Sequence, residues 1–257
     1  MADLNRHTLA GARPGVDVID VGLRAYMLRV YNYMAAGLAI TGIVAYGFFM
    51  LAVTNDPSQA VARVGANGIM LTEFGRLIFV SPLKWVLLFA PLGLVFFLSA
   101  RLHKMSLAGA QLTFWLYAAL VGASLASIFL VYAHGSIAQV FFITAATFGG
   151  LSLYGYTTKS DLSSWGSFLM MGVIGILIAM VVNLFLGSSA LLFAISVIGV
   201  LVFAGLTAYD TQQIKEVYYE GDSELVAGQK SIMGALRLYL DFLNLFLMML
   251  SLFGNRE

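Results

Sequence analysis

Two aspartates lie in apolar surroundings, where a carboxylate is unusual. Asp241 lies inside the apolar stretch Leu238–Phe253, which also carries Asn244 one helical turn later. Asp210 closes the preceding apolar run, in the segment AYDTQQIK. A charged carboxylate at membrane depth costs about 2.5–3.5 kcal/mol even on a lenient insertion scale, so its presence there indicates a partner, a cavity or a function.

The chemistry open to these two acids is proton sharing. Two carboxylates that meet in a low-dielectric site cannot both ionise cheaply, because desolvation and like charge act in the same direction. The pair would hold one proton in common, and its loss would leave two negative charges that repel each other or attract a cation. Hard oxygen ligands suit calcium. Asp210 and Asp241 are therefore predicted to form a proton-gated cation site, with calcium as the permeating or bound ion and no other cofactor.

Structural explanations of the same acids compete with this one. Asp241 could form a salt bridge with Arg237 on the same helix, or with Arg101. Asp210 could be an ordinary acid at a helix end near the lipid headgroups. Both explanations would leave the two acids separately neutralised.

One face of the last apolar stretch collects its polar residues. Arg237, Asp241, Asn244 and Met248 fall at i, i+4, i+7 and i+11, which is one face of a helix. A narrow polar stripe of this kind usually faces the interior of a bundle. Two tyrosines are expected to hydrogen-bond near the acids: Tyr209, directly before Asp210, and Tyr239, shortly before Asp241.

The composition is that of a membrane protein. The chain has 257 residues, of which 60% are hydrophobic and 11% are charged, whereas about a quarter of the residues are charged in soluble domains. The apolar runs are long and recurrent, which favours a polytopic α-helical protein over a β-barrel of short alternating strands. The formal net charge of +1 gives no indication of nucleic-acid binding, and the absence of cysteine excludes disulfides and thiolate chemistry.

Seven apolar stretches each approach the roughly 20 residues that a bilayer-spanning helix needs. They predict an all-α bundle of seven transmembrane helices over residues 26–257, preceded by a polar cytoplasmic tail over residues 1–25. The long first loop is expected to contain a short interfacial helix over Val61–Ile78, and the helix of Asp210 is expected to extend past it and to break near Gly221. The predicted spans are Tyr26–Val53, Lys84–Ala100, Gly109–Ala133, Ile137–Gly155, Trp165–Leu186, Ala190–Tyr209 and Met233–Phe253.

The placement of lysine and arginine predicts a cytoplasmic N-terminus. Most of these residues fall in segments that this orientation places in the cytoplasm, and the exceptions belong to the first loop and its edge: Arg63, Arg76 and Lys84. Asp210 and Arg101 then lie at cytoplasmic helix ends, and Asp241 lies about 12 Å into a span that starts near Met233, at 1.5 Å per residue. A full last span would place the C-terminus on the outer side, whereas a half-inserted helix would leave the tail Asn255–Glu257 inside.

Small residues at close spacing predict tight helix packing. Ala145 with Gly149 and Ala146 with Gly150 are four residues apart, and four more glycines lie in the two following spans: Gly172, Gly175, Gly199 and Gly205. Such positions let helix backbones approach closely. Packing inside one bundle is favoured over a dimer interface.

The segments around both acids resemble the signatures of a known family. AYDTQQIK and the C-terminal LYLDFLNLFLMMLSLFGNRE are similar to the two aspartate motifs of the transmembrane Bax-inhibitor-motif proteins, in their bacterial YccA-like branch. LTFWLYAALVGASLASIFLVY and FFITAATFGGLSLYGYTTKSDLSSWGSFL resemble the same group, so the likeness extends from Tyr26 to Glu257. It implies a seven-helix bundle with the C-terminal helix in the centre, located in the bacterial inner membrane.

The same resemblance implies a pH-sensitive calcium leak. The paired aspartates of the family match Asp210 and Asp241, and their protonation is held to switch the bundle between closed and open forms. Arg101 is the counterpart of an arginine that pairs with the first aspartate in some members. Arg237 is not part of the family pattern, so its nearness to Asp241 is expected to alter the titration of the pair.

Two other functions compete with the leak. Bacterial relatives are also linked to a membrane-bound quality-control protease of the AAA class, so the resemblance allows a non-transporting regulator that binds such a protease through its polar N-terminal segment. An intramembrane aspartyl protease also uses two aspartates, and Tyr209 followed by Asp210 matches its first motif. Its second motif, Gly-x-Gly-Asp, is absent, since Leu-Tyr-Leu precedes Asp241. The chain is therefore predicted not to be an enzyme.

Overall fold

The computed structural model describes residues 21–65 and 68–256. Within them, seven helices are long and apolar enough to cross a membrane, so the predicted seven-helix fold is confirmed. The predicted polar tail lies outside the described residues as far as residue 20, and residues 21–25 already belong to the first helix. The seven helices are α1 (Val21–Ala52), α3 (Leu83–Arg101), α4 (Leu107–Leu125), α5 (His134–Thr157), α6 (Ser163–Leu186), α7 (Ser189–Glu216) and α8 (Glu224–Phe253).

Serine residues define where several of these helices begin. The hydroxyl groups of Ser106, Ser188 and Ser223 accept hydrogen bonds from backbone N–H groups in the first turns of α4, α7 and α8. Such caps satisfy donors that the helix itself leaves unpaired. As predicted, α7 continues past Asp210 to Glu216, and the chain breaks in the segment that contains Gly221. Short 3₁₀ turns follow α3 and α4, at η2 (Leu102–Lys104) and η3 (Ala126–Leu130).

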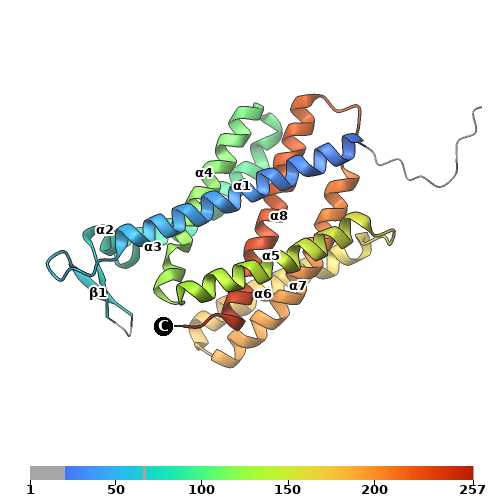
Figure 1. Cartoon of the computed structure of the whole chain (residues 1–257). Coiled ribbons are helices and arrows are strands. Elements are labelled where there is room, and N and C mark those ends of the chain that lie inside the picture. Colours follow the sequence, from blue (N-terminus) through green and yellow to red (C-terminus); the bar gives the residue numbers. More distant parts are fainter. Residues whose placement is uncertain (1–20, 66–67, 257) are drawn as a thin grey trace, which may run out of the picture.

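The bundle consists of two groups of helices with α8 between them (Figure 1). In one group α1 and α3 pack on α4, and in the other α5 and α6 pack on α7. α8 contacts α7, α1, α5 and α4. In its most apolar stretch 61% of the residues are buried, against 11–39% in the other six helices. The C-terminal helix is therefore the central one, as predicted, while α3 and α6 lie at the periphery.

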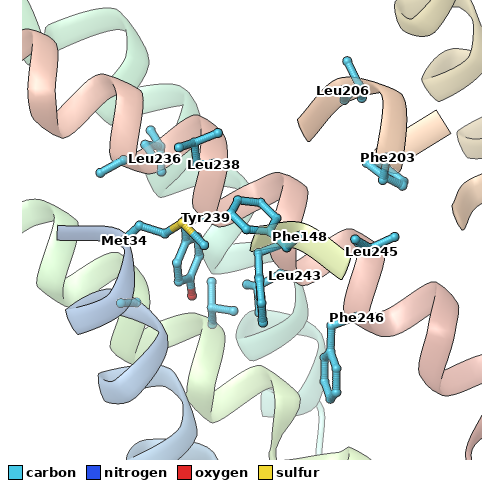
Figure 2. Close-up of a cluster of buried hydrophobic side chains, with 14 of the residues drawn as sticks. Met34, Phe148, Phe203, Leu206, Leu236, Leu238, Tyr239, Leu243, Leu245 and Phe246 are labelled. Carbon is cyan, nitrogen blue, oxygen red and sulfur yellow. The ribbon is translucent and has the colours of Figure 1, made fainter. Parts of the chain in front are cut away.

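The core forms around α8. Figure 2 shows Tyr239, Leu243 and Phe246 of this helix beside Met34 of α1 and Phe148 of α5. Large apolar side chains also cover much of the outer surface, most plainly on the peripheral helix α6. Soluble proteins rarely expose apolar patches larger than a few hundred Å². A bilayer around the bundle accounts for this surface.

The first loop does not form the interfacial helix predicted for Val61–Ile78. Gly65 and Gly68 have φ angles of 77° and 65°, which glycine adopts without strain, and they turn the chain back on itself. The β-branched residues on either side favour strands. The segment therefore folds as an antiparallel hairpin followed by short helical turns: β1 (Ala62–Val64), β2 (Ile69–Leu71), α2 (Glu73–Gly75) and the π-helical η1 (Arg76–Val80).

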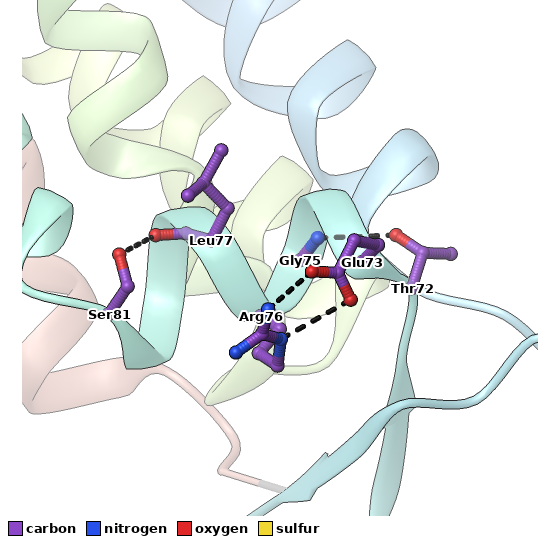
Figure 3. Close-up of polar contacts among 6 residues, drawn as sticks. All are labelled: Thr72, Glu73, Gly75, Arg76, Leu77 and Ser81. Carbon is purple, nitrogen blue, oxygen red and sulfur yellow. Dashed lines mark hydrogen bonds and ion pairs between the residues drawn. The ribbon is translucent and has the colours of Figure 1, made fainter.

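Local polar contacts hold the turn that leads from this hairpin into α3 (Figure 3). The Thr72 hydroxyl accepts a hydrogen bond of 3.1 Å from the Gly75 backbone, and the Ser81 hydroxyl donates to the Leu77 carbonyl. Arg76 forms an ion pair with Glu73, and its guanidinium lowers the pKa of that carboxyl. Contacts among its own residues and hydrogen bonds from Thr72 to the end of α1 together order the loop.

Some of the glycines predicted to allow close helix packing do so, and others do not. A Cβ added at Gly155 of α5 would lie 2.2 Å from the Ala208 carbonyl oxygen of α7. The predicted packing role is confirmed for three glycines whose added Cβ would lie 2.7–2.8 Å from a neighbouring side chain: Gly172, Gly199 and Gly205. It is wrong for Gly149, Gly150 and Gly175, where an added Cβ would meet no atom within 4 Å.

The C-terminal end of α8 is tied to the connection between α4 and α5. The Asn255 carbonyl accepts a hydrogen bond from Ala133 N, and Asn255 N donates to the Ser136 hydroxyl, both at 2.9 Å. The Arg256 guanidinium lies over the Tyr132 ring, 5.6 Å from its centre. This connection is on the opposite face of the bundle from the loop where α8 begins. The last helix therefore crosses the bundle completely.

Candidate functional site

The structure brings the two predicted acids together. Asp210 lies near the end of α7 and Asp241 lies in the middle part of α8, and the two helices pack against each other. The carboxyl groups of Asp210 and Asp241 lie close enough for each to act electrostatically on the other. α8 begins at Glu224, before the predicted start of the span near Met233, so Asp241 lies about 25 Å along its helix at 1.5 Å per residue.

The pair, hereafter the aspartate pair (Asp210 and Asp241), is enclosed by protein. Asp241 is only 5% exposed, and its Oδ2 atom is buried with no hydrogen-bond donor from any other group that the structure describes. The side chain of Asp210 is 16% exposed. Desolvation and the charge of the neighbouring acid both disfavour a second ionised carboxylate here. The donor left for a hydrogen bond between the two carboxyl groups is a proton carried by one of them.

Arg237 supplies the positive charge nearest to the aspartate pair. Its Nη1 atom lies 4.0 Å from Oδ1 of Asp210, at the limit of an ion pair. The arginine side chain is 52% exposed, so solvent screens its charge. The sequence placed Arg237 one turn before Asp241 on the same helix, yet its ion pair is formed with Asp210 across the α7–α8 contact. The positive charge of Arg237 thus faces two carboxyl groups.

Arg101 does not take the predicted place beside Asp210. It ends α3, where its side chain is exposed, and it takes part in none of the ion pairs found among residues 21–65 and 68–256. α3 is a peripheral helix that packs on α4, so its end is not held against α7. The guanidinium group that faces Asp210 is that of Arg237 instead.

The tyrosines predicted to assist the acids point elsewhere. Successive residues on a helix are rotated by about 100°, so Tyr209 and Asp210 face different neighbours. The Tyr209 ring lies over Gly166 of α6. The fully buried Tyr239 forms a hydrogen bond of 2.6 Å with Thr41 of α1. Both tyrosines therefore serve helix packing, and the prediction that they bond near the acids is wrong.

Asn244 of α8 lines a cavity to which neither aspartate contributes. The cavity has a volume of about 230 Å³ and lies between α6, α7 and α8. Ser196 and Ser251 line the same cavity and hydrogen-bond to each other at 2.9 Å. Asn244 therefore extends the polar side of α8 toward the face of the bundle where the helix ends.

A chain of hydroxyl groups that links α1, α5 and α7 was missed by the sequence reasoning. Tyr31 of α1 forms a hydrogen bond of 2.7 Å with Ser152 of α5, and Ser152 forms one of 2.9 Å with Thr211 of α7. Thr211 is the residue after Asp210. The available signal was the occurrence of serine, threonine and tyrosine inside apolar spans, where such groups commonly bond between helices.

The aspartate pair offers few ligands for a tightly held metal ion. Among the described residues there is no group of three or more His, Cys, Asp or Glu side chains that could hold one. Calcium takes six to eight oxygen ligands, and two carboxylates supply at most four. A calcium ion held by these two carboxyl groups alone would need water to complete its shell.

Comparison with known proteins agrees with the motifs around both acids. The family model described as "Inhibitor of apoptosis-promoting Bax1" matches residues 23–257. The chain belongs to the Bax inhibitor family. The match includes both helices of the aspartate pair, so the family resemblance drawn from their motifs is confirmed.

Bacterial relatives of this Bax inhibitor family chain match it over almost its whole length. An uncharacterized protein of Caulobacter vibrioides is 47% identical over 93% of this chain and 92% of the relative. RP147 of Rickettsia prowazekii is 46% identical over 93% and 92%. The Escherichia coli inner membrane protein YbhL is 45% identical over 92% and 94%. With its seven spanning helices, the chain is a multi-pass membrane protein.

Proposed function

We propose that this protein is a cation leak, with calcium as its ion, whose opening is controlled by the protonation of the aspartate pair. The observation that carries the proposal is the contact of two enclosed carboxyl groups, one of which has a buried oxygen without any other donor. One shared proton satisfies that contact. Its loss leaves two adjacent negative charges.

The charge count explains how such a pair could act as a switch. With one proton, the single negative charge of the pair faces the single positive charge of Arg237 at 4.0 Å. Without the proton, one of two negative charges has no counter-ion in a low-dielectric place. The site can then recover stability by admitting a cation or by separating α7 from α8. Either response changes the central contact of the bundle, because α8 is its core helix.

Calcium fits this site as a permeating ion. Carboxylate oxygens are the ligands that calcium prefers, and water completes the shell where a site supplies too few. A passing ion must bind well enough to enter and weakly enough to leave. Beyond the aspartate pair, Asn244 and Ser251 of α8 and Ser196 of α7 provide further polar groups between these two helices.

The location proposed for the leak is the bacterial inner membrane, as for the relative YbhL. The lysine and arginine distribution favours a cytoplasmic N-terminus. The aspartate pair then lies toward the cytoplasmic side of the bundle, where α7 ends. This places the proton control within reach of the cytoplasm.

The test is calcium flux into liposomes that contain the purified full-length protein, measured at acid and neutral pH. The expected result is a flux that depends on the protein and changes with pH, with no cleavage of a transmembrane peptide in a parallel assay. Cleavage without flux would support an intramembrane protease instead. Absence of both would favour the regulator, which would act on a membrane-bound AAA protease without transporting ions.

A further inference from the structure

The seam between the two helix groups is open on one side. A groove of about 1310 Å³ runs between α1 and α5, and its floor includes Phe242 of α8. We call it the α1–α5 groove. Its residues on α1 extend from Arg24 to Ile43, about 28 Å at 1.5 Å per residue, which is close to the thickness of the hydrocarbon core. The groove thus faces lipid over most of a membrane crossing.

The walls of the groove are shaped by small residues that no other helix covers. Gly42 of α1 and Gly149 of α5 line it, and a Cβ added at either glycine would meet no atom within 4 Å. Phe141 and Phe148 of α5 contact the ring of Phe242 at 5.4 Å and 5.5 Å between centroids. The α1–α5 groove therefore has a larger volume than the roughly 300–1,000 Å³ of ordinary small-ligand pockets.

Polarity changes along the groove in the way that a phospholipid requires. One end carries Arg24, which takes part in no ion pair among the described residues. Tyr156 lies at the same end of α5, and the Lys215 ammonium group donates a hydrogen bond of 2.9 Å to its carbonyl. Arg24 therefore lies where a headgroup would lie, and Lys215 is held nearby at the end of α5 without lining the groove. Tyr31 and Ser152, which hydrogen-bond to each other, also line the groove, and beyond them toward Gly42 its lining side chains are apolar.

We propose that the α1–α5 groove binds one anionic phospholipid, with its phosphate at Arg24 and an acyl chain along the groove past Gly149. Basic pockets between transmembrane helices are suited to anionic headgroups, and the bilayer supplies the ligand at the open side. The bound chain would lie against Phe242, the residue after Asp241. Lipid binding here does not depend on ion conduction by the aspartate pair.

Repulsion between arginines disfavours a second copy of the chain as the occupant of the α1–α5 groove. A two-fold dimer uses the same patch on both subunits. Two parallel copies that met at this groove would therefore bring Arg24 of each copy to the same membrane face. Such like-charge juxtaposition opposes association, whereas an anionic headgroup relieves it.

The experiment uses the full-length protein, delipidated in detergent, and two added lipids with identical acyl chains, phosphatidylglycerol and phosphatidylcholine. Native mass spectrometry counts the lipids bound to each chain. The variants are Gly149→Leu and Gly42→Leu, which add side chains to opposite walls of the groove where a Cβ meets no atom within 4 Å, and Arg24→Gln, which removes the headgroup contact. Gly150→Leu is the matched control, because it adds the same side chain one residue away, outside the groove.

The wild type is expected to retain one phosphatidylglycerol, which both groove-filling variants lose and the control keeps. Arg24→Gln should reduce the preference for phosphatidylglycerol over phosphatidylcholine about fivefold, corresponding to ~1 kcal/mol per basic residue near the surface. Retention of the lipid by both Gly149→Leu and Gly42→Leu would overturn the proposal. Equal binding of the two lipids by the wild type would do the same, and so would a dimer that these two variants dissociate.

Discussion

Replacing Asp241 by asparagine isolates the contribution of the shared proton. The side chain is only 5% exposed, so the variant must keep its shape. Asparagine does so, and its amide group can donate the hydrogen bond to Asp210 that the shared proton would otherwise provide. Asp241→Asn is therefore expected to fold, but without the proton equilibrium of the pair.

The size of the effect follows from proton linkage. An unfolded aspartate releases its proton near pH 3.9, as judged from model peptides. If the native pair keeps one proton above that pH, the native state binds more protons than the unfolded state, and stability falls as pH rises. The slope is ~1.36 kcal/mol per pH unit for each retained proton. Between about pH 5 and pH 8 the wild type would lose up to ~4 kcal/mol, and Asp241→Asn would lose none of it.

Thermal unfolding of the purified protein across this pH range measures the slope. A loss of ~4 kcal/mol corresponds to a Tm lower by roughly 8–16 °C for a chain of this size class. Asp161→Asn is the control, because Asp161 is a surface acid whose pKa is lowered by hydrogen bonds from Ser163. Its contribution is present above the unfolded pKa and is lost only as pH falls through the lower native value, so its variant should keep the wild-type slope. Equal slopes in Asp241→Asn and the wild type would refute the reasoning.

Four further substitutions test the surroundings of the aspartate pair and the packing of the bundle. Arg237→Gln should move the pH midpoint of flux upward by about half a pH unit, because an exposed ion pair contributes ~0.2–1 kcal/mol; Arg101→Gln should leave the midpoint unchanged. Tyr239→Phe removes the 2.6 Å hydrogen bond to Thr41 and should lower stability by ~0.5–1.5 kcal/mol in chemical unfolding, with an unchanged flux profile. Gly155→Ala should lower stability by ~1–3 kcal/mol or more, because its Cβ would lie 2.2 Å from a backbone oxygen of α7. Unchanged stability in Gly155→Ala would contradict the close packing of α5 on α7. A shifted pH profile of flux in Tyr239→Phe or Arg101→Gln would contradict the conclusion that these residues lie apart from the aspartate pair.

The bundle and the meeting of Asp210 with Asp241 could be predicted because both depend on properties that run along the chain. Span length and apolar content identify the helices, and one short connection after Glu216 obliges α7 and α8 to lie together. An acid inside an apolar span is also a local signal, since only an interior position lowers its cost.

The partners of the acids could not be predicted because they depend on how each helix is rotated and which helix is peripheral. Arg101 stands at the right membrane level, but its helix packs outside α4. The Tyr209 side chain packs against α6 instead of the acids, and Arg237 pairs with Asp210 on the neighbouring helix. Small residues show the same difficulty. Gly149 and Gly155 are both glycines of α5, yet one lines an open groove and the other lies against α7.

The most direct test of the central claim is infrared difference spectroscopy of the protein in liposomes at neutral pH. The carbonyl band of a protonated carboxyl group reports whether the aspartate pair holds a proton. The account predicts one such band in the wild type that disappears in both Asp210→Asn and Asp241→Asn, because a lone acid beside Arg237 has no second carboxylate to share with. A wild type without the band, or a band that persists in both variants, would contradict it.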